Sequence, residues 1–199
     1  MSTQSPVRVG IFVFDDAEEL DVVGPYEVLA HWAQRSELKP EVVTFSRDGN
    51  GVRCSKGLRL VPDHSAEDVG PLHVVVYPGG KGTRPLAKDS EHLAWVRQLR
   101  STTALMTSVC TGSLVYAAAG LLSGRPATTY WGALDELAQL DPTVLIDAEA
   151  RFVDDGDVVT SAGVSAGIDM ALHLVARLES VDEARAVRRG IQYDPAPPV

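Results

Sequence analysis

The sequence predicts an α/β protein, a three-layer αβα sandwich built on a doubly wound, mostly parallel sheet. Residues 7–14 and 72–77 are nearly continuous apolar runs of strand length, as expected of parallel strands buried on both faces. Segments with helical spacing alternate with such runs; in residues 90–100 the apolar Leu93, Val96 and Leu99 oppose charged side chains. Alternation of strands and helices is typical of doubly wound folds.

Length and composition point to one domain. The chain has 199 residues, of which 45% are hydrophobic, enough for a substantial core. No internal repeat, linker or low-complexity segment divides it. We therefore expect a single domain over residues 1–199, with its core at about 7–193.

The charge and the cysteines limit the partners and the compartment. A formal net charge of −9 makes nucleic acid and anionic membranes poor partners. The two cysteines, Cys54 and Cys110, are far apart and form no CxxC motif, which indicates a reduced setting. The N-terminus has no signal-like apolar segment, and no apolar run approaches the ~18 residues that span a bilayer. We expect a cytoplasmic protein without membrane or nucleic-acid partners.

The first strand leads to a candidate carboxylate. An acidic loop, residues 15–21, follows the strand, and we expect Gly24-Pro25 to open a helix because proline is favoured in the first turn. Asp21 is then either an N-cap or a proton carrier at the edge of the sheet where ligands bind. Sequence alone favours neither role.

The next strands are predicted at residues 41–46 and 72–77, with a short antiparallel excursion over 53–61 between them. Cys54 lies in this excursion and reads as an inert structural thiol. The loop after residue 77 is glycine-rich, but it matches no phosphate-binding motif. Gly79 and Gly80 could let backbone N–H groups donate to developing negative charge, or could simply form a turn.

Cys110 is the strongest candidate for chemistry. It lies between a predicted strand, residues 104–108, and a predicted buried helix that includes Leu114 and Val115. Small residues around it permit a sharp strand-to-helix turn, which would expose the thiol to the free N–H groups of the helix start. We expect that helix end to favour the thiolate, the nucleophilic form. The alternative is that Cys110 is a small buried hydrophobe.

The following segment could contribute to a pocket. Residues 127–131 form a short β-rich run before a predicted helix at 132–140. Tyr130 and Trp131 could line a substrate pocket or belong to the core.

The last third predicts a hairpin and two helices. The hairpin covers residues 151–160 and turns at Asp155-Gly156. A long apolar helix follows at 170–178, and a capping box beginning at Ser180 opens a last helix to about Tyr193. The proline-rich segment 194–199 cannot continue it.

The five histidines predict no metal site. None is adjacent to Cys110 in sequence, and no two have the spacing of metal ligands.

Together these motifs resemble the ThiJ/PfpI superfamily, within the flavodoxin-like, class I glutamine amidotransferase-like folds. The resemblance spans about residues 7–198. The matching stretches are Ile11-Phe-Val-Phe14, Glu19-Leu-Asp-Val-Val-Gly-Pro-Tyr-Glu-Val-Leu29, Val74-Val-Val-Tyr-Pro-Gly-Gly80, Thr107-Ser-Val-Cys-Thr-Gly-Ser113, Ala127-Thr-Thr-Tyr-Trp131 and Thr160-Ser-Ala-Gly-Val-Ser-Ala-Gly-Ile-Asp169.

Within the superfamily the chain looks most similar to the isocyanide hydratases, and it also resembles the ligand-sensing half of AraC-type regulators. Protease-like and deglycase-like members usually have histidine directly after the nucleophile, whereas this chain has Thr111. One departure concerns substrate: the branch commonly has histidine where this chain has Tyr130.

The resemblance implies a homodimer and a cofactor-free addition of water to a small-molecule isocyanide, giving an N-substituted formamide. Cys110 would be the nucleophile and Asp21 would shuttle protons. Thr111 would position Asp21 or the substrate, and N–H groups around Gly80 and Thr111 would stabilise charge. An ionised Asp21 would oppose thiolate formation, so this role requires a raised pKa. The alternatives are a glyoxalase or deglycase acting on small α-oxoaldehydes, and a non-enzymatic cysteine sensor.

Overall fold

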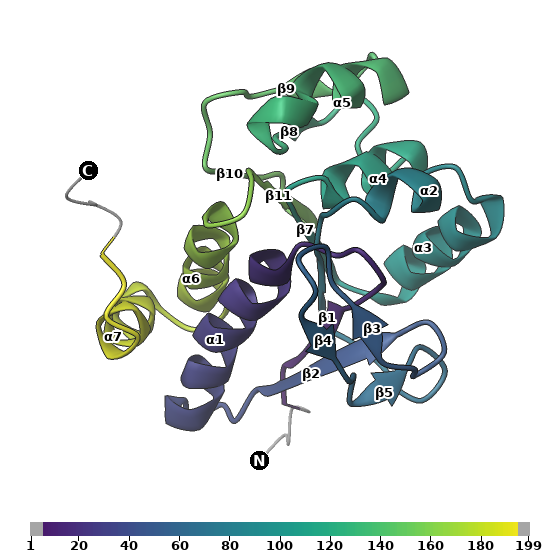
Figure 1. Cartoon of the computed structure of the whole chain (residues 1–199). Coiled ribbons are helices and arrows are strands. Elements are labelled where there is room, and N and C mark those ends of the chain that lie inside the picture. The colour runs from purple at the N-terminus through teal and green to yellow at the C-terminus, as the bar shows by residue number, and fades with distance from the viewer. Residues whose placement is uncertain (1–5, 195–199) are drawn as a thin grey trace.

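A computed structural model describes residues 6–194 and places a seven-stranded sheet between two layers of helices (Figure 1). The strand order is β10-β11-β7-β6-β1-β2-β5, and only β10 runs antiparallel to its neighbour. The predicted doubly wound, mostly parallel sheet is therefore confirmed. Its strands are β1 (Arg8–Phe12), β2 (Glu41–Ser46), β5 (His64–Ser65), β6 (Val74–Tyr77), β7 (Leu105–Val109), β10 (Phe152–Asp154) and β11 (Val158–Ser161).

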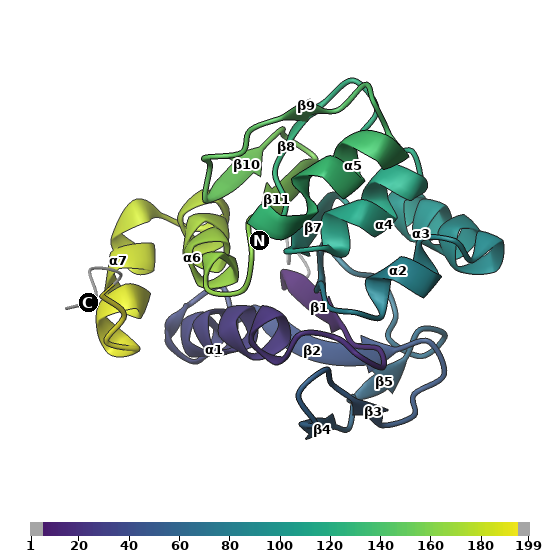
Figure 2. The same cartoon turned by 45° about the horizontal axis from the view of Figure 1, so that its top comes forward.

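Helices cover both faces of this sheet (Figures 1 and 2). One layer holds α1 (Glu19–Arg35), α6 (Ala166–Leu178) and α7 (Val181–Gly190). The other holds α2 (Thr83–Leu86), α3 (Ser90–Thr102), α4 (Gly112–Ala118) and α5 (Leu134–Leu140), with a 3₁₀ turn at Trp131–Ala133 before α5.

Two small sheets lie outside the main one. The antiparallel pair β3 (Val52–Arg53) and β4 (Arg59–Leu60) confirms the predicted excursion. A parallel pair, β8 (Pro126–Ala127) and β9 (Leu145–Ile146), was not expected from the sequence. The predicted hairpin is present as β10 and β11.

The central strands are buried on both faces, which explains their apolar runs. All residues of β6 and β7 are buried, including Thr107 in β7. The Thr107 hydroxyl donates to the carbonyl of Val75 on the neighbouring strand at 2.9 Å, so burial leaves it satisfied.

Helix α1 begins five residues before the predicted start, so the expectation that Gly24-Pro25 opens it was wrong. Pro25 lies inside the helix and has no N–H to donate to the carbonyl of Asp21. Packing against α6 is close here, because a Cβ on Gly24 would lie 3.1 Å from Ile168. Asp21 is consequently within the helix and is not its N-cap, which is Glu18.

The C-terminal helices differ from prediction only at their ends. Helix α6 starts at Ala166 rather than Met170, and α7 ends at Gly190. The Ser180 hydroxyl accepts from the N–H of Glu183 at 3.1 Å, which confirms the predicted cap of α7. Most of the predicted tail, residues 195–199, lies outside the described residues.

The strand order creates a switch point between β1 and β6. From these neighbours the chain proceeds to β2 on one side and to β7 on the other. In such sheets the crevice at the carboxyl ends of the strands is the usual ligand site. The loops after β1, β6 and β7 meet there. Within residues 6–194 no helix has the length and apolar character needed to cross a bilayer.

Candidate active site around Cys110 and Asp21

Cys110 occupies a strained turn between β7 and α4. Its φ of 56° is in the left-handed region, which non-glycine residues rarely adopt. Hydrogen bonds on both sides hold this conformation. The N–H of Cys110 donates to the carbonyls of Ser161 (3.1 Å) and Ala162 (3.2 Å), and its own carbonyl accepts from the hydroxyls of Ser113 (3.1 Å) and Thr129 (3.0 Å). Strain maintained in this way is typical of functional positions.

Asp21 is a fully buried carboxyl with one oxygen in use. Its Oδ2 accepts from the N–H of Gly79 at 2.9 Å, whereas Oδ1 has no hydrogen-bond partner among the described residues. Burial raises the pKa of Asp21 to about 7, and the charge of Glu18 adds to this; the Gly79 N–H and the nearby Cys110 thiol oppose it. The raised pKa that the proton-shuttle role requires is therefore present.

Burial, followed by the charge of Asp21, also raises the pKa of the Cys110 thiol, to about 12. The N–H groups of Thr111 and Val164 and the Thr111 hydroxyl lower it by a smaller amount. The expectation that the helix end would make Cys110 acidic was wrong, because desolvation outweighs a few N–H donors. Because the pKa values of both groups are raised, Cys110 forms a thiolate by passing its proton to Asp21.

The glycine loop binds neighbouring side chains with its N–H groups. Gly79 donates to Asp21, and Gly80 donates to the Thr111 hydroxyl at 2.9 Å, so both N–H groups have acceptors within the protein. The close approach expected of glycine is real: a Cβ on Gly79 would lie 2.5 Å from the nitrogen of Thr111. The Thr111 hydroxyl also contacts that of Thr83 (3.1 Å) and makes no hydrogen bond to Asp21 among the described residues, contrary to one expected role.

Val164 is a component that the sequence reasoning missed. Its φ is 52°, an outlier for a β-branched residue, and its N–H points at the Cys110 sulfur. Gly163-Val164-Ser165 links a buried strand to an apolar helix, as the Cys110 segment does. This similarity in the sequence could have indicated a second sharp turn at Val164.

Cys110 opens into a cavity of about 390 Å³. Tyr130 lines it, which favours the pocket over the core for this residue, but Trp131 does not: its side chain is 75% exposed and stands against the Tyr130 ring with centroids 5.3 Å apart. The lining residues are Glu18, Ser55, Lys56, Gly80, Lys81, Arg84, Cys110, Thr111, Tyr130 and Val164.

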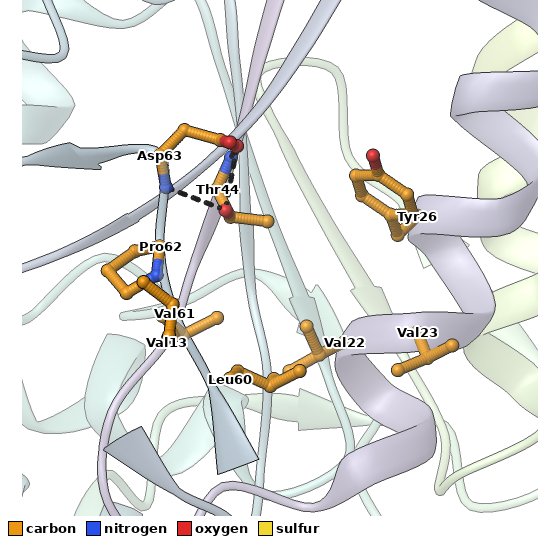
Figure 3. Close-up of a pocket in the computed structure, with 9 residues that line it drawn as sticks. All are labelled: Val13, Val22, Val23, Tyr26, Thr44, Leu60, Val61, Pro62 and Asp63. Carbon is orange, nitrogen blue, oxygen red and sulfur yellow. Dashed lines mark hydrogen bonds between the residues drawn. The ribbon is translucent and has the colours of Figure 1, made fainter. Parts of the chain in front are cut away.

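A second hollow, between α1 and β4, lacks comparable chemistry (Figure 3). Its walls are mainly apolar, including Val22, Val23 and Leu60. Its one carboxylate, Asp63, accepts from the N–H and hydroxyl of Thr44, each at 2.8 Å. Residues 6–194 contain no group of three or more His, Cys, Asp or Glu side chains placed to hold a metal ion. The Cys110 cavity is therefore the candidate active site.

Comparison with known proteins agrees with this geometry. Residues 7–177 match the pattern of the DJ-1/PfpI family. The chain belongs to the DJ-1/PfpI family. Among curated members, an isonitrile hydratase from Pseudomonas putida is 41% identical over 192 residues, which cover 96% of this chain and 81% of that protein. The HTH-type transcriptional regulator GbdR from Pseudomonas aeruginosa is 30% identical, and the match spans 96% of this chain but only about half (52%) of the regulator.

Solved DJ-1/PfpI structures share the fold. A THiJ/PfpI family protein from Pseudomonas syringae superposes with a TM-score of 0.87 at 32% identity, covering 98% of this chain and 78% of that one. Drosophila melanogaster DJ-1beta gives 0.83 at 23% identity, covering 96% and 100%. The second likeness supports the fold alone.

Proposed function

We propose that this DJ-1/PfpI protein hydrates isocyanides to N-substituted formamides with Cys110 as nucleophile. One observation carries the proposal: the buried carboxyl of Asp21 interacts with the thiol of Cys110, which opens into the cavity, and its Oδ1 has no hydrogen-bond partner among the described residues. A carboxyl with a pKa of about 7 can accept and return a proton near neutral pH. The similarity to an isonitrile hydratase supports the substrate class.

The first half of the reaction forms a covalent intermediate. The thiol proton passes to Asp21, and the sulfur of Cys110 attacks the terminal isocyanide carbon. A carbon–sulfur bond forms, and Asp21 delivers its proton to the same carbon, giving a thioimidate. N–H groups of Thr111 and Val164, which face the sulfur, stabilise the thiolate before attack.

The second half releases the product. Ionised Asp21 removes a proton from water, which attacks the thioimidate carbon. The proton of the newly added hydroxyl passes to nitrogen, and the carbon–sulfur bond breaks to give the formamide and the Cys110 thiolate. The proton held by Asp21 then returns to sulfur. Overall one isocyanide and one water give one formamide, so the proposed route needs no cofactor.

The test measures formamide production from an aryl isocyanide by ultraviolet absorbance, with methylglyoxal as the competing substrate. We expect turnover of the isocyanide by the wild type and by Cys54→Ser, and none by Cys110→Ala. Methylglyoxal turnover without formamide would support the glyoxalase or deglycase reading instead. Inactivity on both substrates would favour a sensor.

The proposal includes a cytoplasmic homodimer. Exposed apolar side chains gather around the hollow of Figure 3, and such a patch commonly marks an interface. They are Val23, Tyr26 and Val61. Light scattering after size-exclusion chromatography should give twice the chain mass; a monomer at micromolar concentration would contradict the expectation.

A further inference from the structure

The cavity around Cys110 is cationic although the protein is acidic. The chain contains 27 Asp and Glu residues against 18 Lys and Arg. Among the residues that line the cavity this balance is reversed: Lys56, Lys81 and Arg84 are cations, and Glu18 is the one surface carboxylate. A cavity lined in this way raises the local concentration of anions.

Two of the three cations are already paired. Lys56 contacts Glu18 and lies 3.8 Å from Glu19. Arg84 pairs with Glu136 at 2.8 Å. Lys81, by contrast, has no ion pair and no side-chain hydrogen bond among the described residues, so its charge is the one left for a ligand.

The backbone that carries Lys81 is fixed relative to Cys110. Gly80, immediately before it, is bound to the hydroxyl of Thr111, the residue after Cys110. On the other side the N–H of Gly82 donates to the carbonyl of Asp16 at 3.2 Å. Anchors on both sides hold the start of the Lys81 side chain in place at the cavity, which reduces the entropic cost of using it to bind a ligand.

We propose that Lys81 makes this cavity selective for isocyanides that carry a carboxylate away from the reacting carbon. The inference deepens the proposed function and rests on it. The isocyanide carbon would lie at Cys110, the body of the substrate against the Tyr130 ring, and the carboxylate at the Lys81 ammonium. The reaction is unchanged: 4-isocyanobenzoate and water give 4-formamidobenzoate.

An anion suits this site better than a neutral group of the same shape. A carboxylate accepts charge-assisted hydrogen bonds from an ammonium group, and these are stronger in a partly enclosed cavity than in bulk water. The buried carboxyl beneath does not forbid it, because the pKa of Asp21 is raised to about 7 and Asp21 is protonated in much of the population at neutral pH.

The experiment compares 4-isocyanobenzoate with 4-isocyanobenzamide, which have nearly the same shape but differ in charge. We expect wild-type kcat/KM to be at least about fivefold higher for the carboxylate, the preference shrinking in high salt. Lys81→Gln should remove most of this preference by raising the KM for the carboxylate, with a much smaller change in the KM for the amide. Lys88→Gln, which removes an exposed lysine that does not line the cavity, should retain it.

Binding of the products separates this inference from the proposed function. We expect Lys81→Gln to weaken the binding of 4-formamidobenzoate about fivefold in calorimetry, and to weaken the binding of 4-formamidobenzamide much less. If neither isocyanide is hydrated, the proposed function fails and binding alone decides the role of Lys81. If wild type and Lys81→Gln show the same preference for the carboxylate over the amide, in turnover or in product binding, then Lys81 does not select for an anion. This conclusion would hold even if the amide is hydrated well.

Discussion

Cys110 and Cys54 are both buried thiols, yet their surroundings give them different chemistry. Their side chains are 6% and 2% exposed. Burial raises both pKa values, to about 12 for Cys110 and about 11 for Cys54. Judged by acidity alone, neither would be reactive at neutral pH.

The difference lies in what surrounds each sulfur. Cys110 has the free oxygen of Asp21, two backbone N–H groups and an open cavity. Cys54 lies in the hairpin turn, where the charges of Glu19 and Glu18 raise its pKa and no N–H group offsets them. A proton acceptor and access, rather than a low pKa, therefore set Cys110 apart.

The largest expected effect comes from removing the proton acceptor. Asp21→Asn keeps an oxygen for the Gly79 N–H but cannot exchange a proton, so turnover should fall at least about 100-fold. If activity falls only in proportion to the melting temperature, Asp21 is structural.

The same variant tests the burial of charge. A carboxyl whose pKa is raised from 3.8 to about 7 binds more protons folded than unfolded, so its contribution to stability is present below pH 4 and is lost as pH rises through 7. Relative to wild type, Asp21→Asn should gain stability between pH 4 and pH 8, measured by urea unfolding. A stability difference between the two proteins that does not change with pH would mean that Asp21 is not desolvated.

The next effect distinguishes the two thiols directly. Cys110 alkylation by iodoacetamide should rise with pH up to about 7 and then level off, because a proton must remain on Asp21 for thiolate to form. Cys54 should keep accelerating about tenfold per pH unit. At pH 7 we expect Cys110 to react at least about tenfold faster. Mass spectrometry of wild type, Cys54→Ser and Cys110→Ser gives the rates, and parallel profiles would remove the distinction.

A smaller effect is expected from Tyr130, which lines the Cys110 cavity. The imidazole introduced by Tyr130→His changes charge between pH 5 and 8. The value of kcat/KM should therefore change a few-fold, and its pH profile should gain an additional inflection. Cys54→Ser serves as the matched control. A profile that superposes on that of wild type would exclude Tyr130 from substrate positioning.

The smallest effect concerns Val164. Glycine tolerates a φ of 52°, so Val164→Gly should change the free energy of unfolding by less than about 1 kcal/mol while keeping the N–H that faces Cys110. Activity should stay within about fivefold of wild type. Destabilisation well beyond this would show that the side chain, rather than the backbone, is needed.

Local patterns were sufficient for the fold and for the place of the thiol. The predicted strand at 41–46 agrees with β2, and the predicted cap of α7 and the hairpin at Asp155-Gly156 are confirmed. These features depend on periodicity and turn chemistry within a few residues. The small residues around Cys110 likewise indicated a sharp turn, and its φ of 56° confirms one.

Only the tertiary structure decided what each site group contacts. Gly79 and Asp21 are 58 positions apart, and their hydrogen bond occupies one oxygen of the buried carboxyl and the N–H of the glycine. The start of α1 and the raised pKa of Cys110 likewise follow from packing and desolvation between distant segments. Sequence chemistry names groups that could act, but the three-dimensional arrangement determines which of them are buried, paired or free, because these properties depend on neighbours that local sequence does not specify.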